Sequence, residues 1–127
     1  MMGWRRQLLW VDSLAGATVG VAMLVLAGWL AELFRVPQSL LLAMGVANLL
    51  YASCSGTLAR RRRRPMALIV ALAGANVAWA LVCVTLALVW RGEASLFGLA
   101  HFSLEALFVG GLGWLEWRWR EQLLERV

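Results

Sequence analysis

The stretch SLFGLAHFSLEALFVGGLGWL, residues 95–115, decides the fold. It contains no arginine or lysine, and as a helix rising 1.5 Å per residue it is long enough to cross a hydrocarbon core of roughly 30 Å. His101 and Glu105 stand one helical turn apart near its centre. Because a charged group at that depth costs a few kcal/mol, the run predicts a membrane-spanning helix whose two polar groups need a structural or functional reason.

The composition of the whole chain agrees with a membrane environment. Hydrophobic residues make up 62% and charged residues 15%, whereas a soluble domain carries about 25% charge and an apolar share near one half. The net charge of +5 comes from arginines in short runs and not from a basic face, so we do not expect a nucleic acid partner. Two cysteines without a CxxC or Cys/His cluster give no support for a metal site, and we expect no cofactor.

Three more apolar runs are long enough to span a bilayer. Their short connections make consecutive helices antiparallel neighbours, so the sequence predicts one all-α domain over residues 1–127, a polytopic up-down four-helix bundle. Asp12 and Ser13 are expected to cap the first helix. The tail 118–127 is expected to continue the last helix along the cytoplasmic interface. The predicted spans are 13–34, 39–59, 66–90 and 95–117.

The arginines predict the orientation. Ten of the twelve lie in the N-terminal segment, the middle hairpin and the C-terminal tail, against Arg35 and Arg91 in the opposite loops. The positive-inside rule then places both termini in the cytoplasm, and the use of arginine without lysine favours a bacterial inner membrane. A topogenic signal explains the middle run, and the alternative is binding of anionic phospholipids. The residues concerned are Arg60, Arg61, Arg62, Arg63 and Arg64.

Small residues follow one face of each span, and such faces let helix backbones approach closely in lipid. They would also allow a homo-oligomer or a larger membrane complex. In the second span the face is Gly45, Asn48, Ala52, Ser55 and Ala59; in the third it is Ala73, Asn76, Ala80, Cys83 and Ala87. The first span adds Gly16 and Gly20, and the fourth adds Ser103, Ala106, Gly110 and Gly113.

Polar side chains on these faces are the candidate site. Counting 1.5 Å per residue places two asparagines and Glu105 near the middle of the bilayer, where no arginine can pair with the acid. An aromatic residue follows each asparagine by one helical turn. The candidate proton or ligand site therefore consists of Glu105, His101, Asn48, Asn76, Tyr51 and Trp79.

Three interpretations of this site remain open. In the leading one, a neutral Glu105 is hydrogen-bonded to Asn48 or Asn76 and ties together an accessory or assembly protein that has no enzymatic activity. In the second, Glu105 titrates in a proton-coupled transporter or channel, with His101 on the route to the outer side. In the third, His101 and Glu105 are an acid–base pair that acts on a lipid.

Three features carry a resemblance to known proteins: the Val36-Pro37 turn, the Arg-rich middle hairpin and Trp79 in the third span. In these the chain resembles a broad group of small, uncharacterised bacterial four-span membrane proteins, which implies no activity. It is also similar to small multidrug transporters in length, span number and the single intramembrane glutamate. Their glutamate lies in the first span, however, and Glu105 lies in the fourth. The chain resembles fluoride channels of similar size less, because their Gly-Arg and Phe-box sequences are missing.

Overall fold

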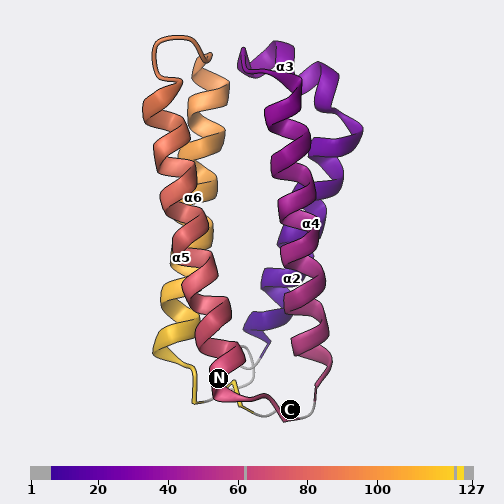
Figure 1. The fold of residues 1–127 in the computed structure, drawn as a ribbon, viewed down its shortest axis with the longest axis vertical. Helices are drawn as coiled ribbons and strands as arrows, with labels where there is room; N and C mark the ends of the chain where they lie inside the picture. Colours follow the sequence, from indigo (N-terminus) through magenta and orange to yellow (C-terminus); the bar gives the residue numbers. More distant parts are fainter. Residues whose placement is uncertain (1–6, 62, 122, 125–127) are drawn as a thin grey trace.

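The computed structural model describes residues 7–61, 63–121 and 123–124, which are helical apart from short connections. Four of the helices are long and apolar enough to cross a membrane, as in a small multi-pass integral membrane protein. The predicted all-α four-helix bundle is thus confirmed (Figure 1). The helices are α2 (Leu8–Val25), α3 (Ala27–Phe34), α4 (Gln38–Arg60), α5 (Met66–Val89) and α6 (Leu96–Arg118).

The last three predicted spans agree with the structure to within one residue at each end, but the first does not. The helix α2 already runs from Leu8, so Asp12 lies inside it and the predicted cap at Asp12 and Ser13 is wrong. At Leu26, with φ −104° and ψ 15°, the helical geometry is interrupted and α3 begins. The sequence contains no proline or charged residue at this point and gives no warning of the break.

Local chemistry explains the turns between helices. Arg35 ends α3 in the left-handed conformation, with φ 58°, a common way to end a helix. Pro37 and Pro65 are extended and directly precede α4 and α5. Ser95 caps α6 by accepting from the Gly98 amide, and its own amide donates to Phe34 O at 2.9 Å. This last bond joins the end of α3 to the start of α6.

The helices pack most closely in two pairs, α2 with α4 and α5 with α6, which Figure 1 shows as two separate columns. Small residues make this packing possible: a Cβ on Gly20 would lie 2.9 Å from Gly45 O, and one on Gly113 would lie 2.9 Å from Ala73 O. The expected small-residue face of α4 is buried along its length. The face predicted for α5 is likewise buried or half-buried.

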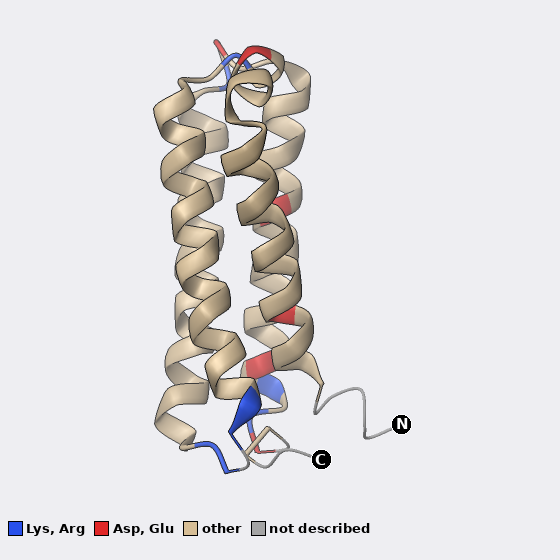
Figure 2. Ribbon diagram, turned by 90° about the vertical axis from the view of Figure 1, so that its right-hand side faces the viewer, with Lys and Arg blue, Asp and Glu red and all other residues tan. Residues whose placement is uncertain are grey.

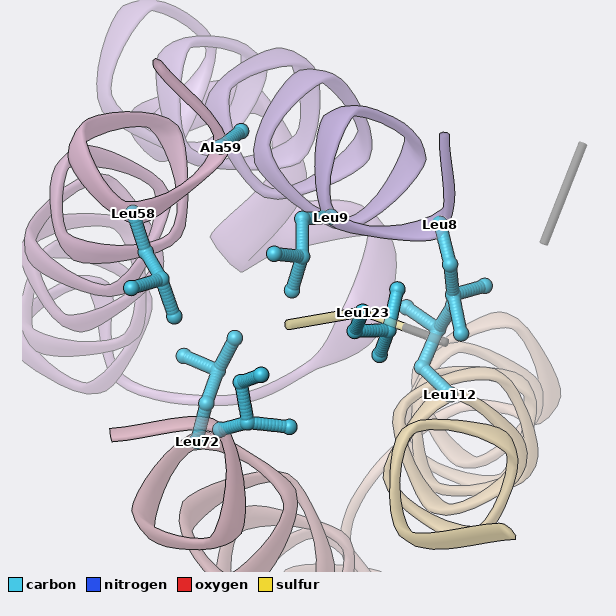
Figure 3. Close-up of a cluster of buried hydrophobic side chains, with 8 residues drawn as sticks. Leu8, Leu9, Leu58, Ala59, Leu72, Leu112 and Leu123 are labelled. Atoms are coloured by element: carbon cyan, nitrogen blue, oxygen red, sulfur yellow. The ribbon is translucent and has the colours of Figure 1, made fainter. Parts of the chain in front are cut away.

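An apolar cluster closes the end of the bundle where α2 begins and α6 ends (Figure 3). Leu123 belongs to it and is fully buried. Helix α6 stops at Arg118 and residues 119–121 form turns, so the prediction that the tail continues the helix is wrong. Residues 122 and 125–127 lie outside the described part of the chain. The cluster consists of Leu8, Leu9, Leu58, Ala59, Ile69, Leu72, Leu112 and Leu123.

Charged residues are unevenly placed along the bundle. Basic residues gather mainly at the end with the apolar cluster, whereas acidic residues also occur along the helices, away from both ends (Figure 2). Three of these acids, Asp12, Glu105 and Glu116, are buried. Burial of an acid in a membrane-spanning helix needs hydrogen-bond partners, and these partners define the candidate site.

The close contact at Gly113 gives a prediction about stability. We expect Gly113→Ala to lower the free energy of unfolding by about 1–3 kcal/mol, because the added methyl group meets the α5 backbone. Gly111→Ala on the same helix is the control: nothing lies within 4 Å of its Cβ position, so it should gain roughly 0.5–1 kcal/mol of helix propensity. Unfolding by dodecyl sulfate in mixed micelles measures both, and equal effects would contradict the described packing.

Candidate functional site

A cavity of about 490 Å³ lies between the two helix pairs. All four long helices contribute to its mainly apolar wall. Leu50, Val82 and Phe108 belong to the wall and are also exposed, so the cavity reaches the outer surface between the helices. The wall carries six residues with polar groups: Asp12, Asn48, Tyr51, Asn76, Trp79 and Glu105. Five of the six predicted site residues are among them.

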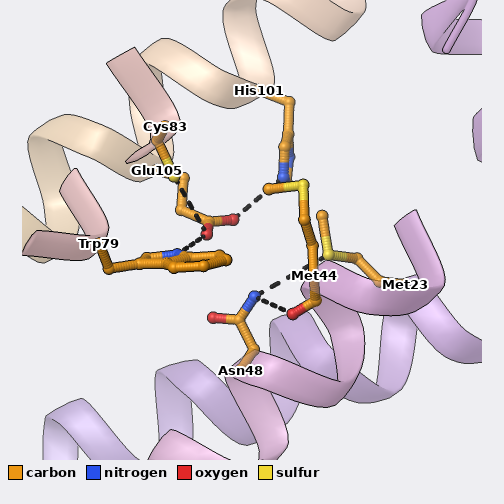
Figure 4. A network of polar contacts seen from close by, with 7 residues as sticks. All are labelled: Met23, Met44, Asn48, Trp79, Cys83, His101 and Glu105. Carbon is orange, nitrogen blue, oxygen red and sulfur yellow. Dashed lines mark hydrogen bonds and ion pairs between the residues drawn. The ribbon is translucent and has the colours of Figure 1, made fainter. Parts of the chain in front are cut away.

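The remaining predicted residue, His101, contacts Glu105 directly (Figure 4). Its Nε2 lies 3.1 Å from Glu105 Oε1, as the i,i+4 spacing on α6 allows. Trp79 Nε1 donates to the other carboxylate oxygen, and Cys83 Sγ approaches that oxygen at 3.5 Å. Glu105 is therefore held by one neighbour on its own helix and two on α5, and all three face it from the α5–α6 pair.

The two asparagines do not bond to Glu105, so the hydrogen bonds expected in the leading interpretation are wrong. Asn48 Nδ2 donates to Met44 O at 2.9 Å on its own helix and approaches Met23 Sδ at 3.9 Å. In Figure 4 the Met44 side chain extends from beside Asn48 toward His101. Both asparagines, one of which was predicted to bond to Glu105, line the same cavity as this acid without a hydrogen bond from either amide to it.

Asn76 instead joins two carboxyl groups that the sequence did not assign to the site. Its Nδ2 donates to Asp12 Oδ2 at 2.9 Å and to Glu116 Oε1 at 2.7 Å. All three side chains are at most 3% exposed, and they come from α2, α5 and α6. We call Asp12, Asn76 and Glu116 the carboxyl–amide triad. The triad links the two helix pairs close to the end of the bundle that contains the apolar cluster.

A signal for these two acids exists in the sequence. Asp12 lies one turn before Gly16 and two turns before Gly20, which places it on the close-packing face of α2. Glu116 lies one turn after Leu112 and Gly113, on the buried face of α6. Asp12 was expected to cap the first helix and Glu116 stands at the end of the predicted fourth span, and these terminal positions hid their place on the buried face.

Tyr51 ties the remaining neighbours, α4 and α5, together. Its hydroxyl donates to Leu72 O at 2.8 Å. The ring lines the central cavity, and the side chain thus has one apolar and one bonded end, as buried tyrosines usually do. The six predicted site residues therefore lie on three helices, α4, α5 and α6.

The polar atoms left over in the cavity wall are hydrogen-bond acceptors. Within the described chain no side chain donates to Asn48 Oδ1 or Asn76 Oδ1, and Glu105 Oε1 has only the His101 contact. No arginine belongs to the wall as described. The cavity therefore combines an apolar surface with acceptor oxygens, which is the complement of an apolar molecule that carries a donor or a positive charge.

The predicted anionic-lipid residues fall into two groups. Arg60, Arg61 and Arg63 are exposed, and the prediction stays with them; Arg62 lies outside the described residues. Arg64 differs from expectation because it is 3% exposed and its guanidinium donates to Leu58 O, Ala59 O and Leu123 O. Its charge is directed into the protein, not toward a headgroup.

Metal ligation finds no support in the arrangement of side chains. In the ranges 7–61, 63–121 and 123–124, no three His, Cys, Asp or Glu side chains come together at metal-binding distance. Cys54 is exposed, Cys83 is buried, and both are free thiols. The side chains that the structure brings together at the site carry carboxyl, imidazole, amide, indole, phenol and thiol groups.

Comparison of the chain with protein-family models, with curated proteins and with solved structures finds no match in any of the three.

Proposed function

We propose that this small integral membrane protein binds an apolar small molecule with a positive charge in the cavity between its helix pairs. The observation that supports the proposal is the composition of the cavity wall, apolar over most of its surface and interrupted by acceptor oxygens without a neighbouring arginine. An ammonium group pairs with Glu105 in this arrangement, and the apolar body of the ligand fills the space toward Leu50 and Phe108.

The surroundings of Glu105 fit such a role. The Trp79 indole lies beside the carboxylate and donates to it, which orients the acid and places an aromatic ring next to the expected cation. His101 contacts the second oxygen, so a proton can move to or from the imidazole when a cation occupies the carboxylate. Cation binding coupled to proton movement is the transporter or channel interpretation of the site.

Matched ligands test the charge requirement. Phenethylammonium, 2-phenylethanol and phenylacetate share a ring and a two-carbon or similar chain but differ in charge. In titration calorimetry of the detergent-purified protein, we expect only the cation to bind well. Glu105→Gln should weaken its binding at least about 30-fold, because the buried partner charge is lost. Glu32→Gln, at an exposed acid on α3, is the control and should bind as the wild type does.

Equal binding of the three ligands, or an unchanged affinity in Glu105→Gln, would refute the proposed site. Proton release into weakly buffered solution on addition of phenethylammonium separates a proton-coupled transporter from a simple binding protein. Turnover of a lipid substrate that is unchanged in His101→Ala would exclude the enzymatic interpretation.

The second candidate function is that of an accessory or assembly protein, packed against itself or within a larger membrane complex. The carboxyl–amide triad favours it, because three buried polar groups from three helices are placed where they hold the bundle together. If the protein has this accessory or assembly function, Glu105→Gln should leave its folding and its activity in the complex unchanged. For both functions we propose a bacterial inner membrane with both termini in the cytoplasm, as the arginine distribution predicts.

A further inference from the structure

A second cavity, of about 520 Å³, lies between α4 and α5 next to their connection. Its position is separate from the acceptor oxygens of the proposed ligand site, since neither Glu105 nor an asparagine lines it. It contacts the central cavity at three shared residues, Tyr51, Cys54 and Ala75. We call this second space the α4–α5 groove.

The groove is charged at one end and apolar along the rest of its length. Arg61 is its one charged lining residue in the described chain, and it is exposed at the end of α4. The hydroxyl groups of Ser53 and Thr57 donate to carbonyls of their own helix and have no hydrogen left for a ligand. The remaining wall is formed mainly by leucine and alanine side chains of both helices.

The length of the groove corresponds to one leaflet of a bilayer. From Arg61 to Tyr51 the helix α4 rises ten residues, or about 15 Å, which is half of a hydrocarbon core of roughly 30 Å. A molecule that matches the groove in charge and length therefore carries an anionic group at the membrane surface and an apolar part about as long as one acyl chain.

We propose that the α4–α5 groove binds an anionic phospholipid, with the phosphate at Arg61 and one acyl chain between α4 and α5. Charge complementarity selects this occupant over a neutral lipid, because basic residues at the membrane surface attract anionic headgroups. It also selects it over an apolar partner helix, which offers no group for the guanidinium. The end of the acyl chain reaches Tyr51 and closes the central cavity on this side.

Native mass spectrometry with two defined lipids tests the proposal. The detergent-purified full chain is titrated with palmitoyl-oleoyl phosphatidylglycerol and with palmitoyl-oleoyl phosphatidylcholine, which have the same acyl chains. We expect one phosphatidylglycerol to bind more tightly than phosphatidylcholine. Arg61→Gln should weaken phosphatidylglycerol binding about fivefold and leave phosphatidylcholine unchanged, since one juxtamembrane arginine is lost.

A second variant addresses the acyl chain. Ala71→Phe fills the groove from α5 and should reduce binding of both lipids. The controls are Arg91→Gln, an exposed arginine in the connection between α5 and α6, and Ala100→Phe, which adds the same ring at an exposed position of α6. Both controls should bind phosphatidylglycerol as the wild type does.

Several results would overturn the proposal. Equal affinity for the two lipids would contradict the headgroup contact, and an effect of Arg91→Gln as large as that of Arg61→Gln would show that only the general surface charge matters. Lipid binding unaffected by Ala71→Phe would show that the acyl chain lies elsewhere. None of these outcomes depends on phenethylammonium binding at Glu105, so the two proposals fail independently.

Discussion

Replacing Asn76 by leucine should lower the free energy of unfolding by about 3–5 kcal/mol, one of the two largest effects that we expect in this protein. Asn76 Nδ2 is the donor shared by Asp12 at 2.9 Å and Glu116 at 2.7 Å. Without it, two carboxyl groups that are almost completely buried lose the amide donor that they share. Removal of one member of a buried polar network costs this much because the others stay desolvated.

Asn48→Leu is the matched control for this prediction. Asn48 is buried as well, but its amide donates to a carbonyl of its own helix and to a methionine sulfur, so the loss should be clearly smaller. Dodecyl sulfate unfolding followed by circular dichroism gives both values. Equal losses in the two variants would mean that burial of an amide, and not the carboxyl–amide triad, determines the effect.

The triple variant Asp12→Leu/Asn76→Leu/Glu116→Leu separates a structural role of the triad from a functional one. When a buried polar network is replaced as a whole by apolar residues of similar volume, stability is often kept or increased. We therefore expect the triple variant to recover most of the stability lost in Asn76→Leu. Phenethylammonium binding in this stable variant then reports whether Asp12 and Asn76, which line the cavity, contribute to the ligand site.

Replacing Arg64 by methionine should cost about 3–5 kcal/mol. The guanidinium donates to three carbonyl groups, two at the end of α4 and one at Leu123, over 2.8–3.0 Å. Methionine keeps the unbranched apolar stem but provides no donor. Leu58 O still accepts from the Arg61 amide, but Ala59 O and Leu123 O lose the guanidinium donor, and each buried group that is left unpaired costs about 1–3 kcal/mol.

Arg63→Met is the control for Arg64→Met because Arg63 is the exposed arginine directly before it. A change at an exposed position of this kind stays within about 0.5 kcal/mol. The same unfolding experiment compares the two variants. If both had the same small effect, the tether between Arg64 and Leu123 would not contribute to stability.

The positions of the helices could be predicted from the sequence because span length and stop residues have a direct physical cause. Pro65 begins α5, and the apolar run from residue 95 predicts α6. The break at Leu26 could not be predicted, since no proline or charged residue marks it. After the break, α3 meets α6 at Phe34 and Gly98, where a Cβ would lie 2.7 Å from a carbonyl oxygen. Such a contact is a property of the assembled bundle.

The sequence identified several of the residues that line the cavity, but it did not assign Asp12 and Glu116 to the site and did not predict which groups bond to one another. Helical periodicity identified Asn48, Asn76 and Glu105 as inward-facing, and all three line one cavity. Which groups bond to one another depends on the relative height of the helices, and a count of residues from uncertain membrane boundaries is too coarse for that. Asn76 was expected in mid-membrane and Glu116 stands at the end of the predicted span 95–117, but the two side chains bond to each other.

The division into two helix pairs also has a consequence for biosynthesis. Each pair consists of long helices that are consecutive along the chain, α2 with α4, separated by the short α3, and α5 with α6. Contacts between sequence neighbours need little loop closure and form early. We therefore expect the first pair to assemble in the membrane while the second is still being translated, so that joining of the two preformed halves is the last step of folding.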